Sequence, residues 1–152
     1  MDQIQKRGFQ GPPRCSLCKQ EIETQEHILN SCMIAQQQWE ETIILFRETN
    51  RNPQDIVQTI FQWGKGQFLC PIVRRAWNLV VGFNIWIIWK ERNRRVFQGK
   101  IISQEALWKI TQSLIRETIL AEAWDKEDWK TNAEENRILR RLNLEQGMVH
   151  PQ

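Results

Sequence analysis

The residues of this chain best suited to chemistry are three cysteines and a histidine, spaced as Cys15-x2-Cys18-x8-His27-x4-Cys32. Zinc in structural sites is held by four nitrogen or sulfur donors, and short loops supply them with a Cys-x2-Cys pair and a later His/Cys pair. The spacing therefore predicts a Zn²⁺ site. Four protein ligands leave no place for an activated water, so we expect a structural zinc. Chance spacing and redox-active thiols are the alternatives.

The segment between the ligands cannot fold by burying apolar surface, because it is short and polar. Zinc binding would supply its folding free energy, on the order of 10 kcal/mol in small fingers. The fourth cysteine, Cys70, precedes a proline far from the others, and we expect a buried apolar side chain rather than a ligand. His150 lies in the tail, where we expect it to be solvated.

A second candidate site is the basic run Lys90-Glu91-Arg92-Asn93-Arg94-Arg95, inside a stretch (74–100) with seven Lys/Arg and one acid. Clustered cations with nearby aromatic residues are typical of surfaces that bind a phosphate backbone and stack bases. The alternative, favoured for this run taken alone, is the solvated last turn of a helix, where cations suit the helix dipole. The candidate nucleic-acid contacts are Arg7, Arg14, Lys19, Lys90, Arg92, Arg94 and Arg95.

Composition narrows the class of protein. The 152 residues suit one ordinary domain, or a small metal module with a helical body, and a net charge of +3 does not resemble a histone-like binder. The first ten residues contain no apolar run typical of a secretory signal, and the apolar stretch 76–89 is too short to span a bilayer. We therefore expect an intracellular protein without a membrane partner, whose reduced thiols favour metal binding over disulfides.

The sequence offers no recognisable catalytic site. One histidine is assigned to zinc and the other to the tail, so a Ser-His-Asp arrangement is not credible. Gly64-x-Gly66 is too little for a phosphate-binding loop, and the acids are scattered along amphipathic stretches. We expect no enzymatic activity; a hydrolase or transferase would need an acid/base site that the sequence does not display.

Hydrophobic periodicity indicates an all-α fold in which a small zinc-binding loop packs on a helical bundle with a hydrophobic central helix. The central stretch is apolar nearly all round, so we expect it to be packed on several sides. A buried strand over 79–88 is the competing interpretation. In the helix begun by Ser103, the apolar face is predicted to hold Leu107, Ile110, Leu114 and Ala121. The expected helices span about 33–49, 52–66, 72–97, 103–124 and 132–144.

Three segments follow from this pattern. Residues 1–49 are a zinc-binding module with its following helix, 50–146 a helical body, and 147–152 a flexible tail.

Several of these residues resemble the zinc-binding domain of reverse transcriptases, the C-terminal module of LINE-type (non-LTR) retrotransposon polyproteins of plants. The family pattern combines an Arg-Gly pair, Cys-x-x-Cys, Glu-Thr-x-Glu-His, a cysteine five residues after the histidine and a tryptophan seven residues later. The matching residues here are Arg7-Gly8, Cys15, Cys18, the run Glu23 to His27, Cys32 and Trp39, and the run Ile88 to Phe97 resembles the segment that follows in plant members.

The resemblance implies a structural zinc on Cys15, Cys18, His27 and Cys32, contact with RNA or DNA beside a polymerase, and residence in the nucleus. The chain lacks the polymerase's Tyr-x-Asp-Asp carboxylates, since it contains no tyrosine. It therefore resembles a detached C-terminal fragment that does not polymerise alone. The His-x4-Cys half resembles a zinc knuckle, which predicts base stacking near Phe9, Leu17 and Ile28.

The alternative function is that of a structural or protein-interaction domain. Zinc would stabilise this domain, and the domain would dock on a reverse transcriptase or another protein. An exposed patch formed by Trp39, Trp63, Trp108, Trp124 and Trp129 would favour this alternative.

Overall fold

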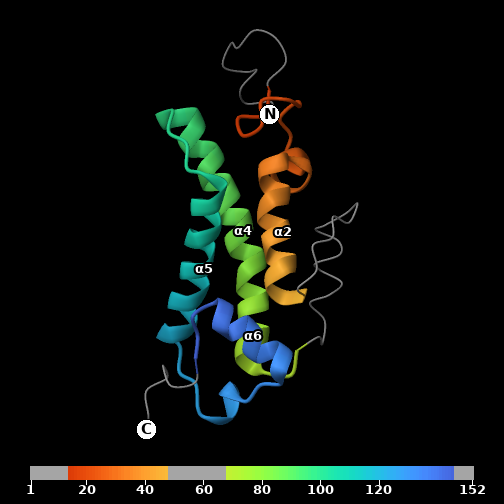
Figure 1. The fold of residues 1–152 in the computed structure, drawn as a ribbon. Helices are drawn as coiled ribbons and strands as arrows, with labels where there is room; N and C mark the ends of the chain where they lie inside the picture. The colour runs from red at the N-terminus through yellow and green to blue at the C-terminus, as the bar shows by residue number, and fades with distance from the viewer. Residues whose placement is uncertain (1–13, 48–67, 146–152) are drawn as a thin grey trace.

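The computed structural model describes residues 14–47 and 68–145, and within these ranges the fold is all-α, as predicted (Figure 1). An isolated antiparallel bridge between Arg14 and Ile22 is the only extended pairing in the described part. The helical elements, in chain order, are a π-helical turn η1 (His27–Ser31), α2 (Met33–Arg47), α4 (Pro71–Gln98), α5 (Gln104–Ala121), a short 3-10 turn η2 (Glu127–Trp129) and α6 (Ala133–Arg141).

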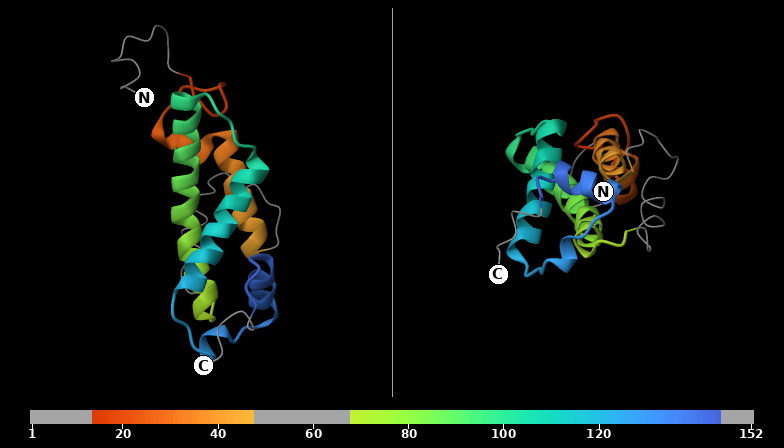
Figure 2. Two further views of the ribbon diagram at one scale, coloured as in Figure 1. Left: turned by 90° about the vertical axis from the view of Figure 1, so that its left-hand side faces the viewer. Right: turned by 60° about the horizontal axis from the view of Figure 1, so that its bottom comes forward.

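Three helices form the body of the molecule. The longest, α4, packs against both α2 and α5, which also contact each other, while the short α6 lies across the end where α4 begins (Figures 1 and 2). The loop that carries Cys15 and Cys18 lies at the opposite end, beside the last turns of α4. The bundle therefore presents the cysteine-rich loop at one pole.

Local capping signals set most helix ends. Pro71 occupies the first turn of α4, and Gly99 ends the helix with a φ of 65°, a left-handed conformation in which glycine is favoured. The Ser103 side chain accepts from the Ala106 N–H at the start of α5, and Asn132 forms a reciprocal capping box with Glu135. The prediction of a central helix over 72–97 is confirmed, and the strand alternative for 79–88 is wrong.

Two predicted helices end early, α5 at Ala121 and α6 at Arg141. The predicted face of α5 is also partly wrong, because Ile110 is 37% exposed and Ala121 is exposed. The buried stripe runs instead along positions four apart, with Trp108 beside it: Leu107, Trp108, Thr111, Ile115 and Ile119. The helix predicted over 52–66 lies outside the described residues.

Aromatic side chains fill the core near the start of α4. The ring of Trp77 meets the edge of Phe46 at a centroid distance of 4.9 Å, and Phe68 packs beside both rings. Cys70 is buried here, as predicted, and its thiol donates to the carbonyl oxygen of Asp128. Burial of aromatic surface on this scale is a dominant source of stability in a small bundle.

A buried polar network crosses the three-helix interface. Gln38 of α2 donates to Asn84 of α4 and to Thr111 of α5, at 3.1 and 3.0 Å, and Asn84 donates to Thr42 at 2.7 Å. All four residues are fully buried. Since a buried polar group without a partner is costly, this network specifies one register of the three helices.

The expectation that α4 is packed on several sides is confirmed where it meets α2, α5 and α6, but one side of the helix is left open by the described residues. Its outward side keeps Ile85 and Trp86 37% and 48% exposed. Residues 14–47 and 68–145 supply no element to cover this side, because α2 and α5 both lie on the opposite one. No helix in these ranges has the length and apolar character of a membrane span.

We predict that Asn84→Ala lowers the free energy of unfolding by about 1–3 kcal/mol, because the buried amide of Gln38 and hydroxyl of Thr42 lose a partner. Urea unfolding followed by circular dichroism measures the change. Asn136→Ala on the exposed side of α6 is the matched control and should leave the midpoint nearly unchanged. Equal midpoints for the two variants would contradict the role of the network.

Candidate metal centre

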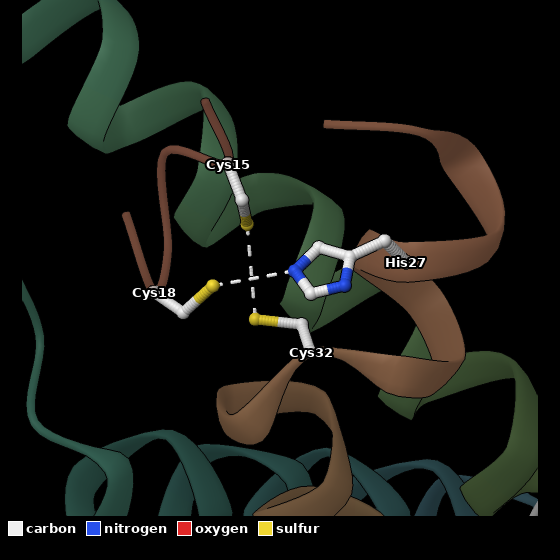
Figure 3. Close-up of side chains that lie close together, drawn as sticks. All are labelled: Cys15, Cys18, His27 and Cys32. Carbon is white, nitrogen blue, oxygen red and sulfur yellow. Dashed lines mark hydrogen bonds between the residues drawn. The ribbon is translucent and has the colours of Figure 1, made fainter. Parts of the chain in front are cut away.

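The four residues predicted to bind zinc lie around a common point (Figure 3). One ligand atom from each of Cys15, Cys18, His27 and Cys32 lies within 4.8 Å of the others. The sulfurs of Cys15 and Cys32 are 3.8 Å apart, and the Cys18 sulfur lies 3.2 Å from His27 Nε2. A tetrahedral zinc with Zn–S bonds of about 2.3 Å holds two sulfurs about 3.8 Å apart, so this donor set fits the ion.

A tight turn presents the first two cysteines. The backbone N–H of Lys19 donates to the carbonyl of Cys15 at 2.8 Å, and Lys19 itself has a positive φ of 60°. The Cys15 N–H donates to the carbonyl of Glu21 at 2.7 Å, which closes the base of the loop. The amides of Leu17 and Gln20 point at the sulfurs of Cys15 and Cys18, where they would stabilise thiolate charge.

The other two ligands come from a π-helical turn. In such a turn the hydrogen bond joins residues five apart, and here the Cys32 N–H donates to the His27 carbonyl at 2.6 Å. Residues five apart thus lie one above the other, which explains the His-x4-Cys spacing. The Thr24 hydroxyl accepts from the His27 N–H at 3.0 Å at the start of this turn, and α2 follows directly after Cys32.

The electrostatics of the cluster favour a bound cation. The hydrogen bond with Cys32 lowers the pKa of the Cys15 thiol to about 5, and that same contact, together with burial, raises the pKa of Cys32. The contact thus favours the loss of one proton from the pair of thiols. Metal binding requires deprotonated thiols, so an ion in this site displaces the remaining protons.

Buried charges fasten the loop to α4. Glu23, whose side chain is 0% exposed, accepts from the Arg92 guanidinium at 2.9 Å and from the backbone N–H and hydroxyl of Ser16. Arg95 donates to the carbonyl of Leu17 at 2.8 Å. The contacts of Arg92 with Glu23 and of Arg95 with Leu17 join residues far apart in the sequence, and together they hold the Cys15–Cys18 turn against the last turns of the helix.

Glu91 organises the same end of α4. Its buried carboxylate pairs with Arg94 and Arg95 and accepts from the backbone N–H of Ile102 at 2.9 Å. Sequence reasoning missed Glu91 and Glu23 as site residues. One signal was available, because Glu91 is the only acidic residue in the stretch 74–100, which also contains seven Lys/Arg.

The structure thus separates the predicted nucleic-acid contacts into two groups. Arg92 is buried and paired with Glu23, while Arg94 and Arg95 are partly exposed and paired with Glu91. Arg14, Lys19 and Lys90 are exposed. Arg7 lies outside the described residues. A cavity of about 360 Å³ opens beside the loop, with these lining residues: Arg14, Cys15, Ser16, Lys19, Arg95, Val96, Gly99 and Ile101.

The predicted stacking residues do not form a surface. Leu17 is 5% exposed and Ile28 is fully buried, because both belong to the core under the loop. Their prediction as base-stacking residues is therefore wrong. Phe9 lies outside the described residues.

We predict that the wild-type protein purified with zinc holds one ion per chain and that Cys32→Ser loses it, together with helical signal from the start of α2. Metal content by mass spectrometry and circular dichroism measure both effects. Cys70→Ser is the matched control, since Cys70 lies outside the cluster, and should retain the ion. Equal zinc content in the Cys32 and Cys70 variants would count against the site.

We predict that Glu23→Gln lowers the free energy of unfolding at pH 7 by about 3 kcal/mol, because Arg92 is left buried without its counter-charge. Burial acts to raise the pKa of Glu23, but hydrogen bonds from Arg92 and Ser16 outweigh it and the net pKa is lowered from 4.5. A lowered pKa in the folded state gives stability that is present above the unfolded value and lost as the pH falls through the folded one.

The stability difference between wild type and Glu23→Gln should therefore shrink as the pH falls below 4.5. Urea titrations at several pH values measure it. Glu21→Gln, in the same loop but exposed, corrects for acid loss of metal and should match the wild type throughout. A difference that stays constant with pH would refute the assignment to this carboxylate.

Comparison with known proteins gives one result that bears on the site. Residues 1–39 match a family model described as zinc-binding in reverse transcriptase, and all four cluster residues lie within the match. No curated protein and no solved structure matches the chain. The family match and the Cys3His cluster together identify the front of this chain as similar to a reverse transcriptase zinc-binding region.

Proposed function

We propose that this protein is a non-catalytic module, organised by one structural zinc ion, that contacts RNA or DNA. The observation that carries the proposal is the convergence of three sulfurs and an imidazole on one point, inside the segment that matches the zinc-binding family model. With four protein ligands the ion has no open position, so its work is to fix the loop.

The nucleic-acid part of the proposal rests on the cations that the loop presents. Arg14 and Lys19 are exposed on the rim of the cavity, and Arg95 lines it from the end of α4. Phosphate groups bind such clusters because each neutralised phosphate releases condensed counterions. Arg92 is withdrawn from the proposed contacts, since its guanidinium is buried against Glu23. Lys90 and Arg94 remain as secondary contacts.

The resemblance extends the proposal to origin and partner. The chain corresponds to the C-terminal zinc module of a LINE-type retrotransposon reverse transcriptase of plants, acts in the nucleus, and holds template or target nucleic acid beside a polymerase. The supporting observations are the family match over residues 1–39 and the Trp-Lys-Glu-Arg-Asn run at residues 89–93.

The alternative, docking on a polymerase through exposed tryptophans, has less support. Trp39, Trp108 and Trp129 are buried and Trp124 is partly buried, so these four do not form an exposed patch. Trp63 lies outside the described residues.

We predict that the zinc-loaded protein binds a labelled single-stranded or duplex oligonucleotide with an affinity that falls steeply with salt. Fluorescence anisotropy over a series from about 50 to 200 mM salt measures the slope of log affinity against log salt. Arg14→Gln and Lys19→Gln should each weaken binding and reduce the magnitude of that slope by about 1, as expected for one lost phosphate contact.

Lys126→Gln is the matched control, since Lys126 is also exposed but lies in the acidic connector far from the loop. It should leave the slope unchanged. No binding at about 50 mM salt, or an affinity independent of salt, would reject the nucleic-acid proposal.

A further inference from the structure

The helix α4 carries a second apolar face, on the side away from α2 and α5. Figure 2 shows α4 along one edge of the bundle. On this face Trp86 is 48% and Phe97 64% exposed, and Leu79, Phe83 and Trp89 are partly buried. A helix that is apolar all round is normally enclosed, and no element within residues 14–47 and 68–145 encloses this one.

A hollow of about 270 Å³ lies in the middle of this face. Four of its lining residues are Leu79, Gly82, Phe83 and Trp86, which occupy positions i, i+3, i+4 and i+7. Four residues at this spacing form the hole that receives a knob from a facing helix in knobs-into-holes packing. The geometry therefore suits a helix rather than a flat surface or a small ligand.

Gly82 contributes no side chain to the floor of this open hollow. A Cβ placed on Gly82 would meet nothing within 4 Å, so packing among residues 14–47 and 68–145 does not require glycine at this position. Glycine is the poorest helix former after proline, and here it lies in the interior of a 28-residue helix. The open space at this position leaves room for a close approach from outside the chain.

The face also carries a side chain suited to fill the hollow. Trp86 lies one turn beyond Gly82, on the same side of the helix, and is the most exposed of the large apolar residues that line the hollow. A two-fold interface requires knob and hole on the same surface patch, because each copy must offer both. We propose that α4 pairs antiparallel with α4 of a second copy, and that Trp86 of each copy inserts over the partner's Gly82.

The charges on the face agree with an antiparallel pairing. When Trp86 lies opposite the partner's Gly82, the same register brings Lys90 opposite the partner's Asn78, which is uncharged and exposed. It also brings Arg75, paired with Glu122, opposite the partner's Asn93. A parallel pairing would set Lys90 against Lys90 and Arg75 against Arg75, and like charges in contact are unfavourable.

The ends of α4 fit the same register. The exposed ring of Phe97 comes opposite the partner's Pro71, next to Leu69, which is 80% exposed. Two strongly exposed apolar residues, one from each end of α4, are thus brought together across the interface. Lys90, whose ammonium lies 4.4 Å from the centroid of its own Trp86 ring, stays at the rim in contact with water.

Sedimentation equilibrium of the zinc-loaded full chain tests the proposal. We expect a concentration-dependent dimer, an increase of about thirty-fold or more in the dissociation constant for Trp86→Ala, and a comparable loss for Gly82→Leu, which fills the hollow. Ser113→Leu, the same addition of apolar surface on the exposed side of α5, is the control and should dimerise like the wild type. Circular dichroism verifies that each variant is folded.

Cross-linking tests the orientation. A mixture of Asn78→Cys and Lys90→Cys chains should form a disulfide-linked heterodimer under mild oxidation by oxidised glutathione, while each variant alone should form much less. A wild type that stays monomeric over the whole concentration range would overturn the proposal. So would a dimer that survives both Trp86→Ala and Gly82→Leu, and efficient cross-linking of Asn78→Cys alone would overturn the antiparallel arrangement.

Discussion

The buried ion pair between Glu23 and Arg92 is the interaction on which the arrangement of this molecule depends. Their side chains are 0% and 6% exposed, and the two residues lie 69 positions apart in the sequence. A charge buried without its partner is far more costly than the pair itself is stabilising. The cysteine-rich loop therefore cannot leave the end of α4 without exposing both groups to water or leaving one charge unpaired. The contact therefore sets the position of the Cys15–Cys18 turn relative to α4.

The buried acids also determine which basic residues of the chain are paired. By composition, residues 74–100 look like a single positively charged surface. In the folded protein Glu91 holds Arg94 and Arg95, and Glu23 holds Arg92, so the arginines join the loop, the helix and the start of the Ile102 segment. The loop itself adds two exposed cations, Arg14 and Lys19. A nucleic acid would thus meet a surface whose shape the paired arginines maintain.

The helix α4 connects the two ends of the molecule, and its two sides have different roles. One face contributes Asn84 to the network with α2 and α5, and its last turns support the metal loop. The opposite side carries exposed apolar residues, among them Trp86 and Phe97, and has a hollow at Gly82. Hydrophobicity alone cannot distinguish these faces, because it reports that a residue prefers burial and not which surface buries it.

Local spacing determined much of this protein in advance. The ligand set Cys15, Cys18, His27 and Cys32 and the all-α class follow from patterns within a few residues, as do the helix starts at Pro71, Ser103 and Asn132, because ligand bite and capping are short-range geometry. Only the tertiary structure decided which arginines are buried, that Leu17 and Ile28 belong to the core, and which stripe of α5 faces inward. Those outcomes depend on contacts between residues that are distant in the sequence. The free energy of burying a charge or a side chain depends on its partner, and the local sequence pattern does not reveal which residue that partner is.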